Sequence, residues 1–255
     1  MLENKILVSI VIHNQSLMVE PLIDELLHLT TSLNLKIILR VNTHEDIANL
    51  YRFFSNPSLI VVHNFELAGY GSNHNRNFEI EPCDYFLVLN PDIRLIDTNF
   101  NDLLRHFKSS EVGVVAPKVV TNDLVLEDSV RVFPSVYALF KRYLFSQGIE
   151  ADRYRLMRSK IDWCAGMFMV FSSNCYRLVN GFDTKYFMYL EDADICLRLR
   201  YLNGKRVMYD DSFSCVHNAQ RASRSFFKKA FLWHVSSLLK FQFTYIRLKY
   251  FKGLK

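Results

Sequence analysis

The chain has 255 residues, half of them hydrophobic, so it can bury a large core and does not have the composition of a disordered protein. Eight glycines and six prolines punctuate it, and it shows no repeat or low-complexity tract. The net charge of +5 hides an asymmetry, because nine basic residues and no acidic one follow Asp211. This asymmetry indicates an anionic partner for the C-terminal segment, either membrane lipid or nucleic acid.

The five cysteines are widely spaced and form no C-x-x-C pair, which indicates neither a zinc site nor a disulfide framework and fits a reducing cytosol. Near the N-terminus, the apolar run Ile6–Ile12 is too short to span a membrane and is followed by no cleavage site. We interpret it as the first buried strand.

Strands and helical stretches then alternate along the first half of the chain. Their lengths predict βαβ units, a mostly parallel sheet and a nucleotide-binding architecture. The predicted strands are Ile6–Ile12, Lys36–Val41, Leu59–Val62, Tyr85–Leu89 and Val112–Val120, and the predicted helices are Leu17–Leu29, Ile47–Phe54 and one that opens at 69–75. After a less regular region at 124–161, an apolar strand follows Asp162, a helix begins near Glu191, and a short strand precedes His217.

The first polar cluster, Asn90-Pro91-Asp92, follows the predicted strand Tyr85–Leu89 directly. Asp92 therefore stands just past the carboxyl end of a strand, where open α/β sheets bind their ligands. A carboxylate there can hold a hard divalent cation that neutralises a diphosphate. The alternative is a plain turn, since all three residues favour turns.

The second cluster comprises Glu191, Asp192 and Asp194 at the predicted start of a helix that stops at Asn203-Gly204. Capping and the helix dipole account for one or two acids there. Three acids exceed what a cap requires, and the dipole helps to keep a general base ionised.

Three further features allow both a functional and a structural interpretation. Gly69 and Gly71 let the backbone approach a phosphate or base, or simply form a turn. Trp163 is either a stacking platform for a sugar or a packed side chain. His217 is either filler or a metal ligand at a strand end.

The C-terminal stretch from Arg224 to Tyr250 has no Gly or Pro and repeats apolar residues at helical spacing. Lys240 and Arg247 interrupt it too often for a spanning helix. We expect an amphipathic helix that lies on an anionic bilayer, packs on the body of the protein, or does both on different faces. Nucleic-acid binding is a weaker alternative, because the segment contains no recognisable nucleic-acid module.

In order and spacing, these segments resemble the inverting glycosyltransferases of family 2, which have a GT-A fold, and especially bacterial O-antigen and capsule rhamnosyltransferases. The resemblance runs from the strand at 8–12 to the residues at 224–227 and rests mainly on Asn90-Pro91-Asp92 and on the segment 187–198. It implies a GT-A domain at 1–220, with a nucleotide-binding half at about 1–120 and an acceptor half at about 121–220, and a basic helical tail at 221–255.

The resemblance also implies roles for individual residues. Asp192 becomes the catalytic base, with Glu191 orienting it or the acceptor, and Asp92 holds Mg²⁺ or Mn²⁺ on the diphosphate, with His217 as a further ligand. Trp163 and Gly166 would bind the acceptor. The residues implied at the nucleotide sugar are Ile12, His13, Asn42, Gly69, Gly71, Asn73, Asn75 and Asn90.

The implied reaction moves a sugar, L-rhamnose from dTDP-rhamnose being the first choice and a UDP- or GDP-linked sugar the alternative. The implied acceptor is a hydroxyl of a polyprenyl-diphosphate-linked glycan, at the inner face of the cytoplasmic membrane. Two departures bear on the donor: Val41-Asn42 replaces the family's Asp-Asn, and His74-Asn75 replaces its Arg-Asn. Two rival functions stay open, a nucleotidyltransferase and a non-catalytic glycan-binding protein on the same fold.

Overall fold

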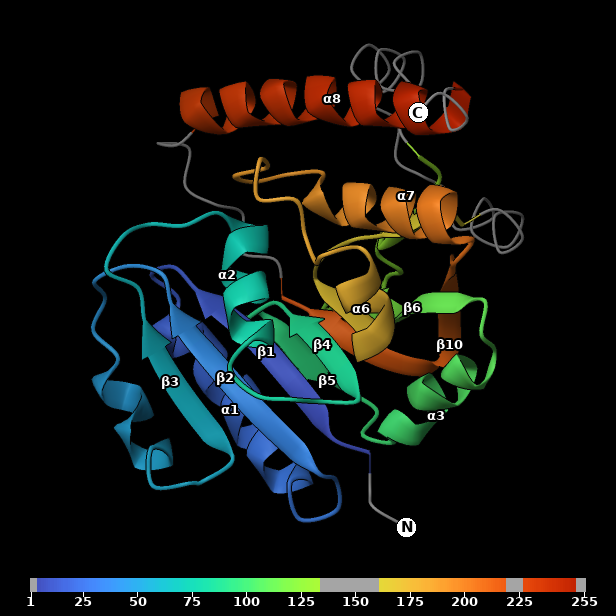
Figure 1. Ribbon diagram of the computed structural model, residues 1–255. Coiled ribbons are helices and arrows are strands. Elements are labelled where there is room, and N and C mark those ends of the chain that lie inside the picture. The colour runs from blue at the N-terminus through green and yellow to red at the C-terminus, as the bar shows by residue number, and fades with distance from the viewer. Residues whose placement is uncertain (1–3, 134–160, 219–226, 251–255) are drawn as a thin grey trace.

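The computed structural model describes residues 4–133, 161–218 and 227–250 of the chain. Residues 134–160 of the predicted acceptor half, and residues 219–226 and 251–255 of the segments around the predicted tail, lie outside this description. The described chain forms one curled sheet of eight strands and a second, two-stranded sheet. Helices cover both faces of the larger sheet (Figure 1).

The strands of the large sheet stand in the order β3-β2-β1-β4-β9-β6-β10-β5. The ladder from β3 to β4 is parallel, as is β6 with β10, whereas β9 and β5 run antiparallel to their neighbours. The predicted open, mostly parallel sheet flanked by helices is thus confirmed. The bounds are β1 Ile6–Ile12, β2 Leu35–Val41, β3 Leu59–His63, β4 Tyr85–Leu89, β5 Ile93–Leu95, β6 Val112–Val120, β9 Phe168–Ser172 and β10 Arg206–His217, with β7 Val130–Arg131 and β8 Trp163–Cys164 in the small sheet.

Two apolar clusters hold the layers together because successive side chains of a strand point to opposite faces. In β1, Ile6 and Val8 belong to the cluster under α1 and α3, while Leu7 belongs to the cluster under α2, α6 and α7. The helices are α1 Ser16–Leu29, α2 Tyr70–Phe78, α3 Phe100–Leu104, α6 Ser173–Leu178, α7 Glu191–Asn203 and α8 Phe227–Tyr250, with short 3-10 turns η1 Ala48–Phe53 and η2 Arg105–Lys108.

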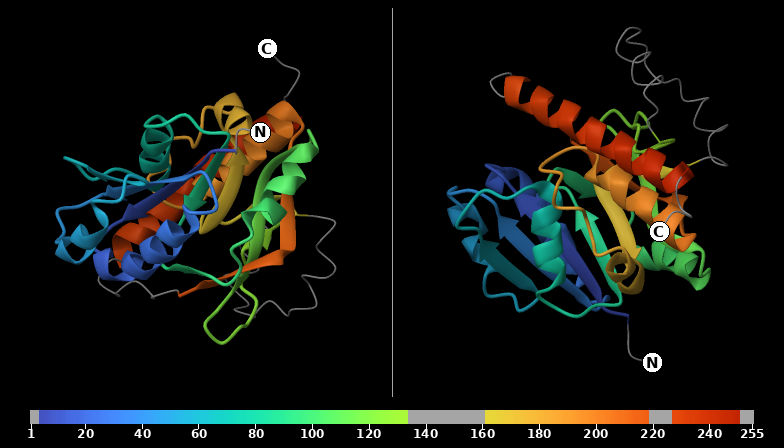
Figure 2. Two further views of the ribbon diagram at one scale, coloured as in Figure 1. Left: turned by 90° about the horizontal axis from the view of Figure 1, so that it is seen from below. Right: turned by 45° about the horizontal axis from the view of Figure 1, so that its top comes forward.

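The long helix α8 lies along the outside of α7, as two views of the molecule show (Figures 1 and 2). Phe241 and Leu248 are its buried anchors in the second apolar cluster. The predicted tail is therefore helical and packs on the body over residues 227–250. Among the described helices, none has an apolar run suited to crossing a bilayer.

The strand order also interleaves the two predicted halves of the enzyme domain. β9, from the second half, is inserted between β4 and β6 of the first, and β5 of the first pairs with β10 of the second. The division near residue 120 remains an interpretation of function, because both halves contribute to one sheet.

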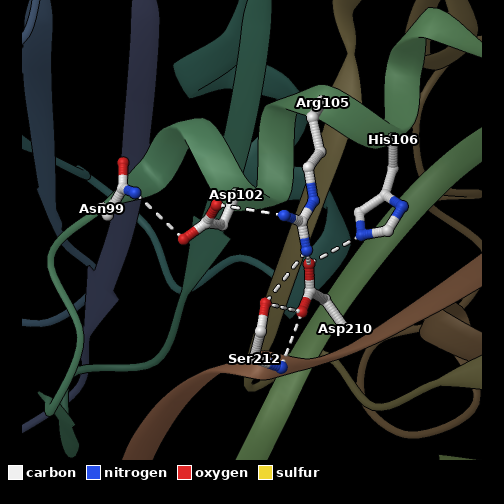
Figure 3. Close-up of polar contacts among 6 residues, drawn as sticks. All are labelled: Asn99, Asp102, Arg105, His106, Asp210 and Ser212. Carbon is white, nitrogen blue, oxygen red and sulfur yellow. Dashed lines mark hydrogen bonds and ion pairs between the residues drawn. The ribbon is translucent and has the colours of Figure 1, made fainter.

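A buried polar cluster fixes an irregularity in β10, where the register against β6 shifts between Asp210 and Ser214. Asp210 is 3% exposed, and its Oδ2 lies 2.6 Å from His106 Nε2 and 3.5 Å from Arg105 Nη2 (Figure 3). Its Oδ1 accepts hydrogen bonds from the backbone N–H and the hydroxyl of Ser212, at 2.7 and 2.5 Å. Every oxygen of this carboxylate is thus satisfied, and the cluster has a structural role.

We expect Asp210→Asn to lower the free energy of unfolding by about 2–3 kcal/mol at pH 7, because the amide cannot accept the same charge-assisted bonds. Burial alone would raise the pKa of Asp210, but the hydrogen bonds from Ser212 and His106 outweigh it and lower the pKa. A carboxyl whose pKa falls on folding stabilises the protein above its unfolded pKa and loses that effect as the pH falls through the folded value. Urea denaturation from pH 7 to pH 3 should therefore show the difference from wild type shrinking in acid. A difference that does not change with pH would contradict this account. The control is Asp102→Asn, because Asp102 is a more exposed carboxylate 3.3 Å from Nη1 of Arg105 (Figure 3).

Candidate active site

The sheet brings Asp92 and His217 together, although 125 positions separate them in the sequence. The short strand β5 follows Asp92 and pairs antiparallel with the end of β10, so that Ile93 stands opposite His217. Nε2 of His217 then lies 3.2 Å from Oδ2 of Asp92. Oδ1 of Asp92 is buried without a partner among the described residues. An orphaned carboxylate oxygen at the end of a strand is the kind of atom that a ligand or cation satisfies.

Glu127 completes this group from the chain segment after β6. Its Oε2 lies 2.8 Å from Nδ1 of His217, so the imidazole is held between two carboxylates. Burial lowers the pKa of His217, but the hydrogen bonds and charges of Asp92 and Glu127 outweigh burial and raise it. A carboxylate on one ring nitrogen is the usual device that directs the other nitrogen toward a metal. Glu127 could not be found from the sequence, because no motif marks it and its partner His217 is distant in the chain.

The donor set at this point suits a hard or borderline divalent cation bound together with a diphosphate. Asp92 offers a free carboxylate oxygen, His217 an imidazole nitrogen and Asn90 a neutral amide nearby. Among the described residues there is no group of three or more His, Cys, Asp or Glu with metal-binding geometry. The residues therefore fit a cation that takes most of its ligands from phosphate oxygens and water.

The three acids at the start of α7 have three different environments. The two residues before them, Tyr189 and Leu190, adopt left-handed backbone angles with φ of 75° and 64°. Such strain in non-glycine residues persists only where the surrounding structure enforces it, and it clusters at functional sites. Asp194 is fully buried, and its Oδ2 accepts a 2.6 Å bond from Nε of Arg198. Asp194 thus has a structural role.

Glu191 is 6% exposed, and its Oε2 has no hydrogen-bond partner in the described structure. Burial raises the pKa of Glu191 to about 8, and the negative charge of Asp192 adds to the shift. At neutral pH, Glu191 therefore holds a proton and is a neutral hydrogen-bond donor, not a base.

Asp192 is the partly exposed member of the three and the one available to a substrate. Its Oδ2 accepts the backbone N–H of Gly166 at 2.9 Å, and its Oδ1 accepts that of Ala193 at 2.8 Å. Burial raises the pKa of Asp192, and these two N–H groups limit the rise. An ionised carboxylate with a raised pKa is a stronger base than a free aspartate, which suits proton abstraction near neutral pH.

Tyr70 connects the two polar clusters, and the sequence did not single it out. Its hydroxyl donates to the backbone oxygen of Gly166 at 2.6 Å and lies 3.5 Å from Oδ1 of Asn90. Gly166 in turn holds Asp192, and the N–H of Asn90 donates to Met167 O at 3.0 Å. Burial and the charges of Glu191, Asp192 and Asp92 raise the pKa of Tyr70 well above its usual value, so it remains a donor. The chain segments that carry the carboxylates at 92 and 192 therefore meet at the hydroxyl of Tyr70.

The chain is similar to known proteins both in sequence and in structure. The chain is 35% identical over 189 residues to rhamnosyltransferase WbbL of Escherichia coli strain K12, an alignment that covers 68% of this chain and 70% of that protein. The chain belongs to the rhamnosyltransferases of glycosyltransferase family 2. No protein-family model matches this glycosyltransferase.

A more distant relative of the transferase is the N-acetylglucosaminyl-diphospho-decaprenol L-rhamnosyltransferase of Mycobacterium tuberculosis strain H37Rv, 23% identical over 151 residues. The alignment covers 55% of this chain and about half, 49%, of that relative. Two solved structures share the GT-A fold. One is the mannosyltransferase PcManGT of Pyrobaculum calidifontis in complex with GDP-Man and Mn²⁺, with a TM-score of 0.65 and 13% identity, and the match covers 96% of this chain and 65% of that one. The other is GalNAc-T7 with UDP, GalNAc and Mn²⁺, with a TM-score of 0.62 and 14% identity, and the match covers 88% of this chain and 45% of that one.

The two glycines of the transferase's 69–75 loop are required for packing. A Cβ on Gly69 would lie 2.6 Å from the oxygen of Phe187, and one on Gly71 would lie 2.5 Å from Cβ of Phe182. The N–H of Tyr70 is also taken, because it donates to Phe187 O at 2.9 Å. This loop therefore packs on the segment before α7, and its predicted contact with the nucleotide sugar stays a prediction.

Three asparagines predicted at the nucleotide sugar have structural partners instead. Asn42 exchanges hydrogen bonds with the backbone of Ala68, Asn73 is fully buried and donates to the same oxygen, and Asn75 clamps the backbone of Phe182. We therefore replace their predicted nucleotide contacts with a role in positioning loops. Ile12 is likewise buried in the core, whereas His13 is exposed and available to a ligand.

The two residues that depart from the family's donor motifs, Val41 in place of Asp and His74 in place of Arg, are both buried inside the protein. Val41 is buried in the core, and His74 is fully buried with Nδ1 2.6 Å from the hydroxyl of Ser9. Burial, with the charge of Arg40, lowers the pKa of His74 to about 3, so it is neutral. Neither side chain replaces the missing charged contact.

Trp163 packs in the interior. Its ring is 5% exposed, its Nε1 donates to Val132 O at 3.0 Å, and the Arg131 guanidinium lies over the ring at 5.2 Å. The structure thus corrects the prediction of an open stacking platform. Gly166, which holds Asp192, is the residue of this segment that borders the site.

The protonated Glu191 should reduce the stability of the transferase as the pH rises. In the unfolded chain its carboxyl ionises near its ordinary pKa, whereas in the fold it holds its proton up to about pH 8. Folding stability therefore falls between those values. At pH 8.5 we expect the free energy of unfolding of Glu191→Gln, measured by urea denaturation, to be about 1–3 kcal/mol higher than that of wild type. At pH 4.5 we expect little difference between the two. Equal stability at both pH values would show that Glu191 is not buried as a neutral acid.

Proposed function

We propose that this glycosyltransferase moves L-rhamnose from dTDP-L-rhamnose to a hydroxyl of a polyprenyl-diphosphate-linked glycan, with inversion at the anomeric carbon. The donor sugar is supported by the names of its two relatives, both L-rhamnosyl- or rhamnosyltransferases. The lipid-linked acceptor is supported by the mycobacterial relative, whose name specifies a diphospho-decaprenol. The single observation that supports the chemistry is the position of the Tyr70 hydroxyl, which donates to the oxygen of Gly166, the residue whose N–H holds Asp192, and lies 3.5 Å from Oδ1 of Asn90, two residues before Asp92.

In the proposed mechanism, Asp192 accepts the proton of the acceptor hydroxyl as the oxygen attacks the anomeric carbon. The N–H groups of Gly166 and Ala193 fix the carboxylate during this transfer. Glu191 is buried and protonated, so it cannot act as a second base or as a nucleophile that would form a covalent intermediate. A single base and a direct displacement give inversion.

The departing dTDP is proposed to leave beside Asp92, His217 and Asn90. These residues would hold Mg²⁺ or Mn²⁺, and the cation, when bound, neutralises charge that develops on the diphosphate. His13, exposed at the end of β1, is proposed to border the nucleotide.

We also propose that the enzyme is cytoplasmic and lies on the inner face of the membrane through α8. Six exposed apolar residues recur along this helix at intervals of three or four, opposite the buried Phe241 and Leu248, and we call them the outer stripe: Leu232, Val235, Leu239, Phe243, Ile246 and Tyr250. Lys240, Arg247 and Lys249 flank it, and no acidic residue is present in the helix. This combination fits a bilayer with anionic headgroups better than it fits nucleic acid, which would leave the apolar stripe in water.

The function is tested by incubating the purified chain with dTDP-L-rhamnose, UDP-sugars and GDP-sugars, each with a polyprenyl-diphosphate N-acetylglucosamine acceptor and Mg²⁺ or Mn²⁺. We expect metal-dependent release of dTDP and a glycan of inverted anomeric configuration by NMR. Release of UDP or GDP instead would overturn the donor assignment. Turnover only of a sugar phosphate with a nucleoside triphosphate would identify a nucleotidyltransferase, and turnover of none of these with retained glycan binding would identify a non-catalytic protein.

A further inference from the structure

The inner side of α8 touches the segment 185–190, which leads directly into the catalytic acids. The ring of Trp233 lies against that of Phe187 with centroids 4.7 Å apart, and His234 meets Tyr189 at 5.1 Å. The hydroxyl of Ser237 donates to Met188 O at 2.9 Å, one turn further along. After the next turn, Nζ of Lys240 donates to Lys185 O at 2.6 Å. The contacts thus follow the segment over most of its length.

The same segment meets the site on its other side. Phe187 O accepts the N–H of Tyr70 and lies against Gly69, so the position of Phe187 sets the entry into α2. Tyr189 and Leu190 hold left-handed backbone angles immediately before Glu191. Because such angles are unfavourable for non-glycine residues, they depend on the contacts around them. A shift of this segment would therefore move both Tyr70 and the acids at the start of α7.

α8 is held unevenly by the rest of the protein. Its second half is anchored by the buried Phe241 and Leu248, with Phe241 5.9 Å from the ring of Phe133. In its first half, Phe231, Leu232 and Val235 are exposed. Among the side chains described from 231 onward, the half with Trp233 and Ser237 thus has no large buried apolar anchor. A helix of this kind gains stability when a bilayer covers its apolar stripe.

We propose that α8 positions the catalytic carboxylates through the 185–190 segment, and that an anionic bilayer on its outer stripe raises turnover by ordering that segment. Trp233 and Ser237 are the positioning residues. The proposal rests on the proposed function for its activity readout. Its physical basis is linkage: a bilayer that binds α8 more tightly when Trp233 and Ser237 hold the segment shifts the population toward that state.

The first test measures amide hydrogen exchange of the full chain across residues 185–192, with no donor present. Vesicles of phosphatidylglycerol and phosphatidylcholine are expected to slow exchange in this segment by about fivefold, and phosphatidylcholine vesicles alone are expected not to. Wild-type protein that floats with the anionic vesicles but shows unchanged exchange there would overturn the proposal. Protein that does not float with them would overturn it as well. Because no sugar is needed, failure of the proposed donor or acceptor does not affect this result.

The second test compares variants of the two faces of α8. Trp233→Leu and Ser237→Ala should speed exchange across 185–192 and lower kcat by about tenfold with the donor KM unchanged, while Trp233→Phe, which keeps the ring contact, should stay near wild type. The matched outer variant, Leu239→Ser with Phe243→Ser, should keep wild-type exchange in solution and lose the response to vesicles. Circular dichroism checks that each variant is folded. Folded inner-face variants with wild-type exchange and kcat would overturn the proposal, as would an outer variant that still responds to vesicles.

Discussion

Replacing Asp192 with asparagine is expected to lower kcat by about 10²–10⁴-fold, the range typical for the loss of a general base. The amide has nearly the same shape, and its oxygen can still accept the N–H of Gly166, so the segment around Tyr70 should keep its structure. Donor binding should therefore be retained. The measurement is steady-state dTDP release with an acceptor present, together with calorimetric binding of dTDP to the variant.

The matched control is Glu191→Gln, one residue away. Because Glu191 is already protonated at neutral pH, a neutral amide should reproduce its state, and kcat should stay within about tenfold of wild type. If Asp192→Asn turned over normally while Glu191→Gln was inactive, the roles of the two acids would be exchanged. Loss of dTDP binding in Asp192→Asn, with normal turnover of bound donor, would also exclude it as the base.

The parallel core of the fold could be predicted from the sequence because strands buried on both faces are continuous apolar runs. The predicted strands Ile6–Ile12, Tyr85–Leu89 and Val112–Val120 match β1, β4 and β6 to the residue. Prediction was poorer where charge interrupts the pattern: β10 is twelve residues long, but Asp210 and Asp211 at its bulge hid its first half. The helix predicted at 47–54 is a 3-10 turn in the structure. The short elements α3, α6 and β5 were missed, because elements of so few residues show no periodic pattern of apolar side chains.

Within the site, the motifs located the chemistry but not the partners. Asp92 and Asp192 stand at element ends, which are visible in a sequence. The contacts of Tyr70 with Gly166 and of His217 with Glu127 join positions about a hundred residues apart and depend on β9 and β10 entering the sheet next to β4 and β6. The acids at α7 show the same limit: the sequence predicts three, and only burial distinguishes the paired Asp194 and the protonated Glu191 from the accessible Asp192.

The second large effect is expected at Asp92. Asp92→Asn removes the charged, unpartnered oxygen and leaves the His217 ring and the Asn90 amide at the site. Mn²⁺ affinity in the presence of dTDP should fall by about 100-fold or more, and kcat/KM for the donor by about 10²–10³-fold, as the loss of several kcal/mol of charge stabilisation requires. Mn²⁺ binding is read by electron paramagnetic resonance, with dTDP as the probe nucleotide.

The contrast with Glu127→Gln tests whether this arrangement works as a metal centre. Glu127 lies against the far nitrogen of His217, so Glu127→Gln should lower Mn²⁺ affinity by about 10–100-fold, which is less than the effect of Asp92→Asn. Asp102→Asn, the same charge change in the surface cluster with Asn99 and Arg105, should leave Mn²⁺ binding unchanged. If all three variants bound Mn²⁺ alike, the orphaned oxygen of Asp92 would not be a metal ligand.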